Sequence, residues 1–186
     1  PGAGFDMHPH DNMEIVSIVL RGKLQHRDNL GNGDVLKPGD VQKMTAGSGI
    51  IHSEFNPSDK EPVHFLQIWI IPNMLDLRPS YEQKAFNRKS MTNRLTLLVS
   101  PDGHNGSLEI HQDAEIWQIL LEENKDTEFA INHSRKIWIQ VAEGSVSTNE
   151  HLLVAGDGLA VSDEEDIIRL RGIDKLSNII IFNLRA

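Results

Sequence analysis

Short hydrophobic runs alternate with turn-forming residues along this chain. The runs are rich in β-branched and aromatic side chains and too short for stable helices, as at Ile15–Leu20, Phe65–Ile71 and Ile137–Val141. Turn signals separate them, as at Gly31–Asp34, Pro38–Asp40, Pro101–Gly103 and Gly156–Gly158. This spacing predicts an all-β protein of the sandwich, jelly-roll or small-barrel kind.

The least regular stretch runs from Pro72 to Asn93. It contains Pro72, Pro79 and several charges, and it lacks hydrophobic alternation. We interpret it as a linker and expect two domains, 1–90 and 91–186.

A weak internal repeat supports two similar halves. The segment Val35–Asp40 resembles Leu152–Asp157, and each is followed twelve residues later by a residue that two isoleucines precede, His52 and Arg169. The alignment places Ala130, Asn132, Arg169 and Arg171 where the first half has His8, His10, His52 and Glu54. Arginine stays protonated and has no lone pair to donate, so we expect a metal site in the first half alone.

Two pairs of metal-binding residue types carry the candidate chemistry. His8 and His10 flank Pro9, and His52 and Glu54 flank Ser53. In an extended strand, side chains at i and i+2 point to the same face. Three imidazoles and one carboxylate from two strands can hold one transition metal and leave coordination positions open. Pro9 has no N–H to donate, which fits a strand start or an edge strand.

Composition excludes several classes of protein. The 186 residues allow one large or two small domains with a real core, and hydrophobic residues make up 39% without a run long enough to span a membrane. Cysteine is absent, which rules out disulfides and thiolate ligands and favours a cytoplasmic setting. The net charge of -9, with 18 dispersed Lys and Arg residues, disfavours direct binding to nucleic acid.

No export leader is visible at the start of the sequence. Because the sequence begins at Pro1 rather than Met, a leader upstream of Pro1 stays an open alternative.

The sequence around the two pairs resembles the cupin motifs. His8-Pro9-His10, with Glu14 and then Gly22, is similar to the first motif, and Gly49–Asn56 fits the end of the second. Gly22 comes one residue later than usual, and Gly47 replaces the usual proline. These departures, with Glu54, resemble the pirin family of bicupins. Further matching segments are Pro38–Asp40, Met44–Glu54, Gln67–Ile70, Pro79–Gln83 and Ser100–Gly103.

The resemblance implies two tandem cupin domains, each a β jelly roll. It implies one metal, commonly iron, held by His8, His10, His52 and Glu54 in the first domain, and a second domain without ligands. Mn, Co, Ni, Cu or Zn would suit such a ligand set nearly as well. Glu14 binds metal in many other cupins but resembles a bystander in pirins, and its direct ligation stays an alternative. Pirins carry further strands before the position of Pro1, without which the first barrel would be partly open.

The function that the resemblance implies is a metal-dependent dioxygenase that cleaves flavonols such as quercetin with O2. In this hypothesis Glu54 takes the proton of a metal-bound hydroxyl. The alternative is a non-enzymatic, metal-containing regulatory module that binds a protein partner, such as a transcription factor or a metabolic enzyme. A cupin isomerase or hydrolase is a third hypothesis. We expect a monomer that binds neither nucleic acid nor membrane.

The remaining histidines and the tryptophans have structural interpretations. We expect His64 to be a framework histidine, and His64 and Gln67 have opposite parity on one strand, so a bulge would be needed for both to face inward. We expect solvated side chains at His26, His104, His111, His133 and His151, and in the acidic run Asp163–Asp166. We expect core positions for Trp69, Trp117 and Trp138.

Overall fold

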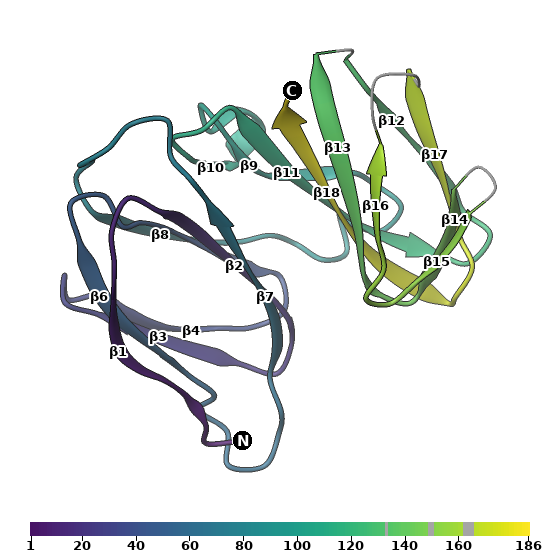
Figure 1. The fold of residues 1–186 in the computed structure, drawn as a ribbon. Helices are drawn as coiled ribbons and strands as arrows, with labels where there is room; N and C mark the ends of the chain where they lie inside the picture. Colours follow the sequence, from purple (N-terminus) through teal and green to yellow (C-terminus); the bar gives the residue numbers. More distant parts are fainter. Residues whose placement is uncertain (133, 149–150, 162–165) are drawn as a thin grey trace. The chain divides into compact units, whose positions relative to one another are not determined.

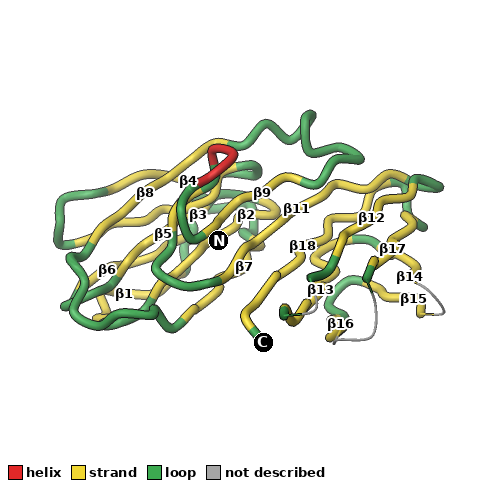
Figure 2. The backbone as a smooth tube through the Cα atoms, turned by 90° about the horizontal axis from the view of Figure 1, so that it is seen from above, coloured by secondary structure: helices red, strands yellow, loops and turns green. Residues whose placement is uncertain are grey.

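The protein is built almost entirely of β-strands, as its sequence predicts. The structure, a computed structural model, describes residues 1–132, 134–148, 151–161 and 166–186. In those residues the one helical element is the 3-10 turn η1 (His104–Gly106), drawn red in Figure 2. His133 and residues 163–165 of the acidic run lie outside the described residues. None of the described residues forms a helix that is long and apolar enough to cross a membrane.

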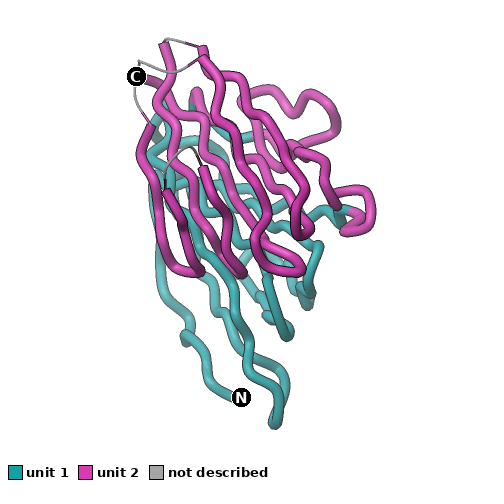
Figure 3. The backbone as a smooth tube through the Cα atoms, turned by 90° about the vertical axis from the view of Figure 1, so that its right-hand side faces the viewer, with its two compact units in different colours: residues 1–86, 110–112 teal, residues 87–109, 113–186 magenta. Residues whose placement is uncertain are grey.

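The chain folds into two compact units, coloured separately in Figure 3. The first contains residues 1–86 and 110–112, and the second contains residues 87–109 and 113–186.

Two four-stranded antiparallel sheets form the first unit (Figure 1). The first sheet has the order β1 (Gly4–His10), β6 (Ile50–Phe55), β3 (Leu24–Asp28) and β4 (Gly33–Leu36). The second sheet has the order β7 (His64–Ile70), β2 (Glu14–Arg21), β5 (Asp40–Thr45) and β8 (Ser80–Ala85). Side chains from the two sheets meet in the interior of the unit.

Strand β8 lies inside the stretch 72–93 that we interpreted as a linker. It pairs with β5 from Ser80 to Ala85, so the linker interpretation is wrong for these residues. Its half-buried side chains include Tyr81 and Gln83, whose hydroxyl and amide hydrogen-bond to each other. Because these positions are polar, the strand shows no hydrophobic alternation in the sequence.

The second unit has a six-stranded and a four-stranded sheet. The larger sheet has the order β10 (Leu108–Glu109), β9 (Thr96–Ser100), β11 (Ala114–Glu122), β18 (Leu176–Arg185), β13 (Arg135–Glu143) and β16 (Gly158–Val161). The smaller sheet has the order β12 (Asp126–Ala130), β17 (Ile167–Gly172), β14 (Ser145–Thr148) and β15 (His151–Val154).

The strand order of the first unit recurs in the second. The order β1-β6-β3-β4 becomes β12-β17-β14-β15, and the order β7-β2-β5 becomes β18-β13-β16, so corresponding strand numbers differ by eleven throughout. The internal repeat that the sequence suggested is therefore present in the topology.

The interiors of the two units differ in chemistry. In the second unit, strands β12 and β17 bury Phe129, Ile168 and Leu170 in one large hydrophobic cluster. Arg169 and Arg171, which the alignment set against His52 and Glu54, are exposed. The alignment of the two halves therefore pairs His52 and Glu54 with outward-facing residues. A shift of one residue would pair them with inward-facing ones. The first unit has smaller apolar clusters and also buries polar side chains, among them Ser17, His26, Gln42, His52 and Glu54.

Two of the three predicted core tryptophans are exposed. Trp69 is 56% and Trp138 is 40% exposed, whereas Trp117 is partly buried against the core of its unit. The ring of Trp138 lies over Gly158, where an added Cβ would approach within 2.0 Å of the ring. Because Gly158 has no side chain, the indole of Trp138 can pack over its backbone on the outer face of the sheet. This packing explains how an aromatic residue of a hydrophobic run lies outside the core.

Candidate metal centre

The pairing of β1 with β6 brings three histidines together. His8 lies directly opposite His52 in this antiparallel pair, and a register shift between Phe5 and His8 interrupts the ladder just before the site. Strand β1 is at the edge of its sheet, and Pro9 is exposed there. The placement of Pro9 fits its missing N–H, because an edge strand leaves one side of its backbone unpaired.

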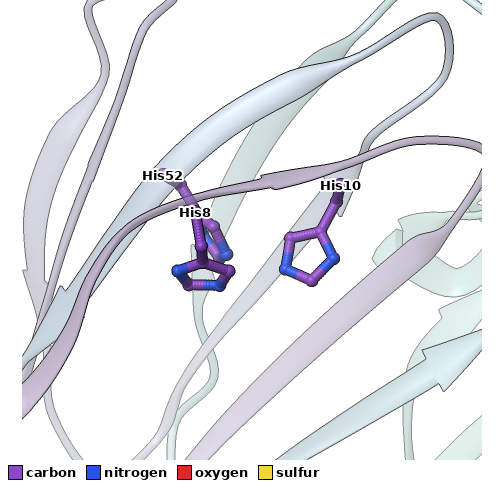
Figure 4. Close-up of side chains that lie close together, drawn as sticks. All are labelled: His8, His10 and His52. Atoms are coloured by element: carbon purple, nitrogen blue, oxygen red, sulfur yellow. The ribbon is translucent and has the colours of Figure 1, made fainter.

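The imidazoles of His8, His10 and His52 point toward one another (Figure 4). Their ring centroids are 4.9 Å apart for His8 and His10, 4.4 Å for His8 and His52, and 5.0 Å for His10 and His52. One ring nitrogen from each lies within 4.8 Å of the others, which is a spacing that a single metal ion can bridge. The spacing at i and i+2 thus gathers the three histidines as the sequence suggested.

Burial favours the neutral form of the His10 and His52 imidazoles. Burial, and next the neighbouring His8, lower the pKa of His52 to about 3 and also lower the pKa of His10. His8 donates its Nδ1–H to the backbone carbonyl of Asp6 at 2.7 Å, which leaves the Nε2 lone pair of His8 free. A neutral imidazole with a free lone pair is the form that binds a metal ion.

Two ring nitrogens in the cluster lack a hydrogen-bond partner. In the part of the chain that the structure describes, the buried side-chain atoms without one are His10 Nε2, His52 Nε2 and Gln42 Oε1. A buried polar atom without a partner is costly and needs an explanation, such as an ion. The donor set and these two nitrogens fit a divalent transition metal bound between His8, His10 and His52.

Glu54 lies beside this cluster and is buried. It forms a second group with His26 and His52 whose ligand atoms lie within 4.8 Å of one another, and the structure does not gather it into one group with His8 and His10. Glu54 accepts a hydrogen bond from Gln67 Nε2 at 2.5 Å and another from Ser17 Oγ at 3.5 Å. Burial raises the pKa of the Glu54 carboxyl, and the bond from Gln67 opposes that rise.

A row of polar residues crosses the second sheet of this unit and faces these groups. Ser17 is paired with Gln67 on one side and with Gln42 on the other. Gln67 and Ser17 bind Glu54, and Gln42 Nε2 lies 3.2 Å from His26 Nδ1. Sequence reasoning noted Gln67 alone. The signal for the row was a polar residue within each of three strands that also contain hydrophobic residues.

His26 is buried, so the prediction that it is solvated is wrong. It lies opposite Glu54 in the β3–β6 pair and stacks on Tyr81 with a centroid distance of 4.8 Å. Its Nε2 is 3.2 Å from Asp28 Oδ2, and its Nδ1 is 3.4 Å from His52 Nδ1. His26 has the same parity as the buried Leu24 on this strand, which would have indicated an inward side chain.

Glu14 is fully buried and belongs to neither metal-binding group. It accepts hydrogen bonds from Thr45 Oγ1 at 3.0 Å and from His111 Nδ1 at 3.2 Å. His111 is therefore partnered and half-buried, contrary to its predicted solvation. Burial raises the pKa of Glu14.

His64 and Gln67 have opposite parity on β7, and their side chains point to opposite faces of the sheet. Gln67 reaches inward to Glu54, whereas His64 is exposed rather than part of the framework. His104 and His151 are exposed, as predicted.

A cavity of about 280 Å³ opens next to Glu54 in the first unit. Glu54 is the one charged residue in its lining, which consists of Ala3, Gly4, Phe5, Leu24, Glu54, Val63 and Phe65. A mostly apolar pocket with one well-placed polar group is typical of sites for small organic molecules.

Comparison with known proteins assigns both units to one family. Residues 2–70 match the family model described as pirin, and residues 97–184 match the quercetinase C-terminal cupin domain. The quercetin 2,3-dioxygenase of Escherichia coli is 40% identical over 183 residues, which are 98% of this chain and 77% of that protein. The crystal structure of bacterial pirin YhhW from Escherichia coli in complex with nickel(II) has a TM-score of 0.90 and 38% identity, covering 99% of this chain and 77% of that one. The structure of YhaK from Escherichia coli has a TM-score of 0.84 and 26% identity, covering 100% and 81%. The chain therefore belongs to the pirin family.

Proposed function

We propose that the first unit binds one divalent transition metal through His8, His10 and His52, with Glu54 as the fourth ligand. The observation that carries the proposal is the pair of buried, unpartnered nitrogens, His10 Nε2 and His52 Nε2, in a cluster of three imidazoles. The nickel complex of the related YhhW protein supports a divalent metal. Iron is the metal that we favour, and a site of this composition also accepts nickel and its neighbours.

The reaction that we propose is oxidative ring cleavage of a flavonol, as the names of the relatives suggest. Both atoms of O2 enter the ring-opened product, and one ring carbon leaves with its own oxygen as carbon monoxide, so the reaction needs no added reductant. The bound metal would supply Lewis acidity, which stabilises the deprotonated 3-hydroxyl of the flavonol.

Glu54 is the residue that we propose as the proton acceptor. Its carboxyl is buried and its pKa is raised, so it is a stronger base than an exposed glutamate. Gln67 and Ser17 hold the carboxylate in place by hydrogen bonds from the facing sheet. Glu54 lines the cavity and also groups with His52, which supports a role for it next to a bound substrate.

The cavity next to Glu54 suits an aromatic substrate. Phe5 and Phe65 line it together with aliphatic side chains, so a planar phenolic ring would be bound mainly by apolar contact.

The decisive experiment combines metal analysis with aerobic turnover. Protein reconstituted with iron should bleach the flavonol absorption band in aerated buffer and release carbon monoxide, and Glu54→Gln, loaded with enough iron to saturate its weaker site, should lose turnover. His64→Gln serves as the control, because His64 is an exposed imidazole on β7. An unchanged flavonol band with the metal-loaded wild type would overturn the enzymatic proposal. In that case, retained metal together with capture of a specific protein partner would support the regulatory alternative.

A further inference from the structure

A buried chain of hydrogen-bonding groups leads away from the histidine cluster. The Nδ1 atoms of His52 and His26 are 3.4 Å apart, and His26 Nε2 is 3.2 Å from Asp28 Oδ2. The side chains of His26 and Asp28 are both fully buried. In the pairing of the strands, His52 lies between two partners, opposite His8 on β1 and opposite Asp28 on β3.

Asp28 is fixed at the end of this chain. Its Oδ1 accepts hydrogen bonds from the backbone N–H groups of Leu30 and Asn32 at 2.9 and 3.0 Å, and its Oδ2 accepts one from Asn32 Nδ2 at 2.9 Å. Burial alone would raise the pKa of Asp28, but the hydrogen bonds from Asn32, His26 and Leu30 outweigh it and lower the pKa. Asp28 is therefore an ionised, immobile acceptor.

The ionised carboxylate of Asp28 determines which ring nitrogen carries the proton in His26 and in His52. Because Asp28 can only accept, His26 Nε2 must carry the proton, and in neutral His26 the Nδ1 atom is then an acceptor. His52 Nδ1 faces that acceptor, so it carries the proton of His52. The lone pair of His52 is then on Nε2, the buried ring nitrogen that lacks a hydrogen-bond partner.

The orientation of Gln42 agrees with this assignment. Its Nε2, a donor, lies 3.2 Å from His26 Nδ1, while its Oε1 is the buried acceptor without a partner. Turning the amide around would place Oε1 against His26 Nδ1 and would require a proton there. A neutral His26 would then have a bare Nε2 facing the Asp28 carboxylate, and two lone pairs would repel each other.

We infer that His26 is a positioning residue, which together with Asp28 fixes His52 in the Nδ1–H tautomer and presents His52 Nε2 to the metal. Metal-bound histidines commonly donate their other N–H to an acceptor, and loss of that acceptor typically lowers metal affinity 10- to 100-fold. Here the acceptor is a second imidazole that is itself held by a carboxylate. The inference deepens the proposed function and rests on it for the identity of the ion.

The first test reads the tautomers directly in the metal-free protein. Long-range 1H–15N NMR spectra of the imidazole rings should show Nε2–H for His26 and Nδ1–H for His52 at neutral pH. In His26→Phe, which keeps an aromatic ring against Tyr81, the preference of His52 for Nδ1–H should disappear. Detection of His52 as the Nε2–H tautomer in wild type, or of an unchanged tautomer in His26→Phe, would overturn the inference.

The second test measures affinity for nickel and zinc by competition with a chelator. His26→Phe should bind 10- to 100-fold more weakly, whereas His26→Gln, whose carbonyl can accept from His52 Nδ1–H, should recover part of the loss. Tyr81→Phe is the matched control, because it removes only a hydroxyl that bonds to Gln83 and should change affinity less than twofold. Should His26→Phe fail to fold, Asp28→Asn tests the same chain from its far end, with the same expected direction.

The two tests separate the inference from the proposed function. A wild-type protein that binds no divalent metal would contradict the metal centre, while its NMR spectrum would still show whether His26 sets the tautomer of His52. Normal metal binding by His26→Phe with an altered tautomer would contradict the positioning role alone.

Discussion

Gln67 Nε2 donates a hydrogen bond of 2.5 Å to Glu54 Oε2, although the two residues lie on different sheets of the first unit. The orientation of the Gln67 amide is fixed by a second bond, which Trp69 Nε1–H donates to Gln67 Oε1 at 3.1 Å. A side chain at this position must therefore donate to Glu54 and accept from Trp69, and glutamine does both. Through this amide the second sheet holds the carboxylate that the first sheet contributes to the site.

Replacing Gln67 by methionine should weaken metal binding, most of all at low pH. Without the donor, the carboxylate of Glu54 loses the contact that opposes the effect of burial, so the pKa of Glu54 rises further. Protonation then competes with the metal up to a higher pH, and the acid limb of a binding curve should move to higher pH. Affinity at neutral pH should fall about tenfold. Metal titrations between acid and neutral pH measure both effects.

Gln83→Met is the control for this prediction, because Gln83 belongs to the second sheet too but bonds to Tyr81. Equal pH profiles for Gln67→Met and wild type would show that Gln67 does not support Glu54.

Replacing Glu14 by alanine should affect stability rather than metal binding. Glu14 is fully buried and accepts bonds from Thr45 and His111, so its loss leaves the buried Thr45 hydroxyl and the half-buried His111 imidazole without this acceptor. The free energy of unfolding should fall by about 1–3 kcal/mol, as measured by urea denaturation. Metal affinity should stay within twofold of wild type, and a tenfold loss in a folded variant would make Glu14, rather than Glu54, the fourth ligand.

Substituting Gly4 by alanine should disturb the site from the far end of β1. A Cβ at Gly4 would lie 2.2 Å from the carbonyl oxygen of Glu54 and 2.6 Å from Phe55 Cα, so β1 must move away from β6. The clash should cost about 1–3 kcal/mol in unfolding free energy and weaken metal binding, since β1 carries two of the histidines. Gly33→Ala is the matched control, because its nearest atoms would be at 3.6 Å. Unchanged metal affinity in Gly4→Ala would show that the cluster does not depend on this approach.

The metal-free protein should lose stability as the pH falls from 6.5 toward about 3, because His52 stays neutral in the folded protein over this range. Burial, with His8 next, lowers the pKa of His52 from 6.5 to about 3. Between these values the unfolded chain binds a proton that the folded chain does not, so the free energy of unfolding decreases as pH decreases. Above pH 6.5 this contribution is fully present. Urea denaturation at a series of pH values should give a smaller slope for His52→Asn than for wild type.

Because Glu14 and Glu54 are present in both proteins, the difference between the two slopes isolates His52. Identical slopes would mean that His52 is protonated in the folded state over the same range as in the unfolded chain.

Trp69 should report metal binding by fluorescence. Its indole packs edge-on against His10 at a centroid distance of 5.2 Å and is 56% exposed. Nickel or copper bound at the neighbouring histidines should quench its emission, and the quenching should disappear in Trp69→Phe. Trp138→Phe is the control, because Trp138 belongs to the second unit and its loss should leave the metal-dependent change in place. Quenching that persists in Trp69→Phe would place the ion elsewhere.

The sequence by itself determined the all-β fold, the two similar halves and the nature of the candidate ligands. These features are local or repeat along the chain. Alternation with a period of two predicts strands, and the spacing of His8 with His10 and of His52 with Glu54 puts each pair on one face. Exposure was harder to predict, because Trp69 lies in a hydrophobic run and is nevertheless exposed at the edge strand β7.

Only the tertiary structure decided which residues meet. The placement of His52 between His8 and Asp28, and of His26 opposite Glu54, follows from the register of three strands that are far apart in the sequence. The row of Gln67, Ser17 and Gln42 likewise exists only because β7, β2 and β5 pair in one register. A slip of one residue would turn each of these side chains to the opposite face. The candidate ligands are therefore readable from the sequence, whereas the residues that contact them are set by strand pairing.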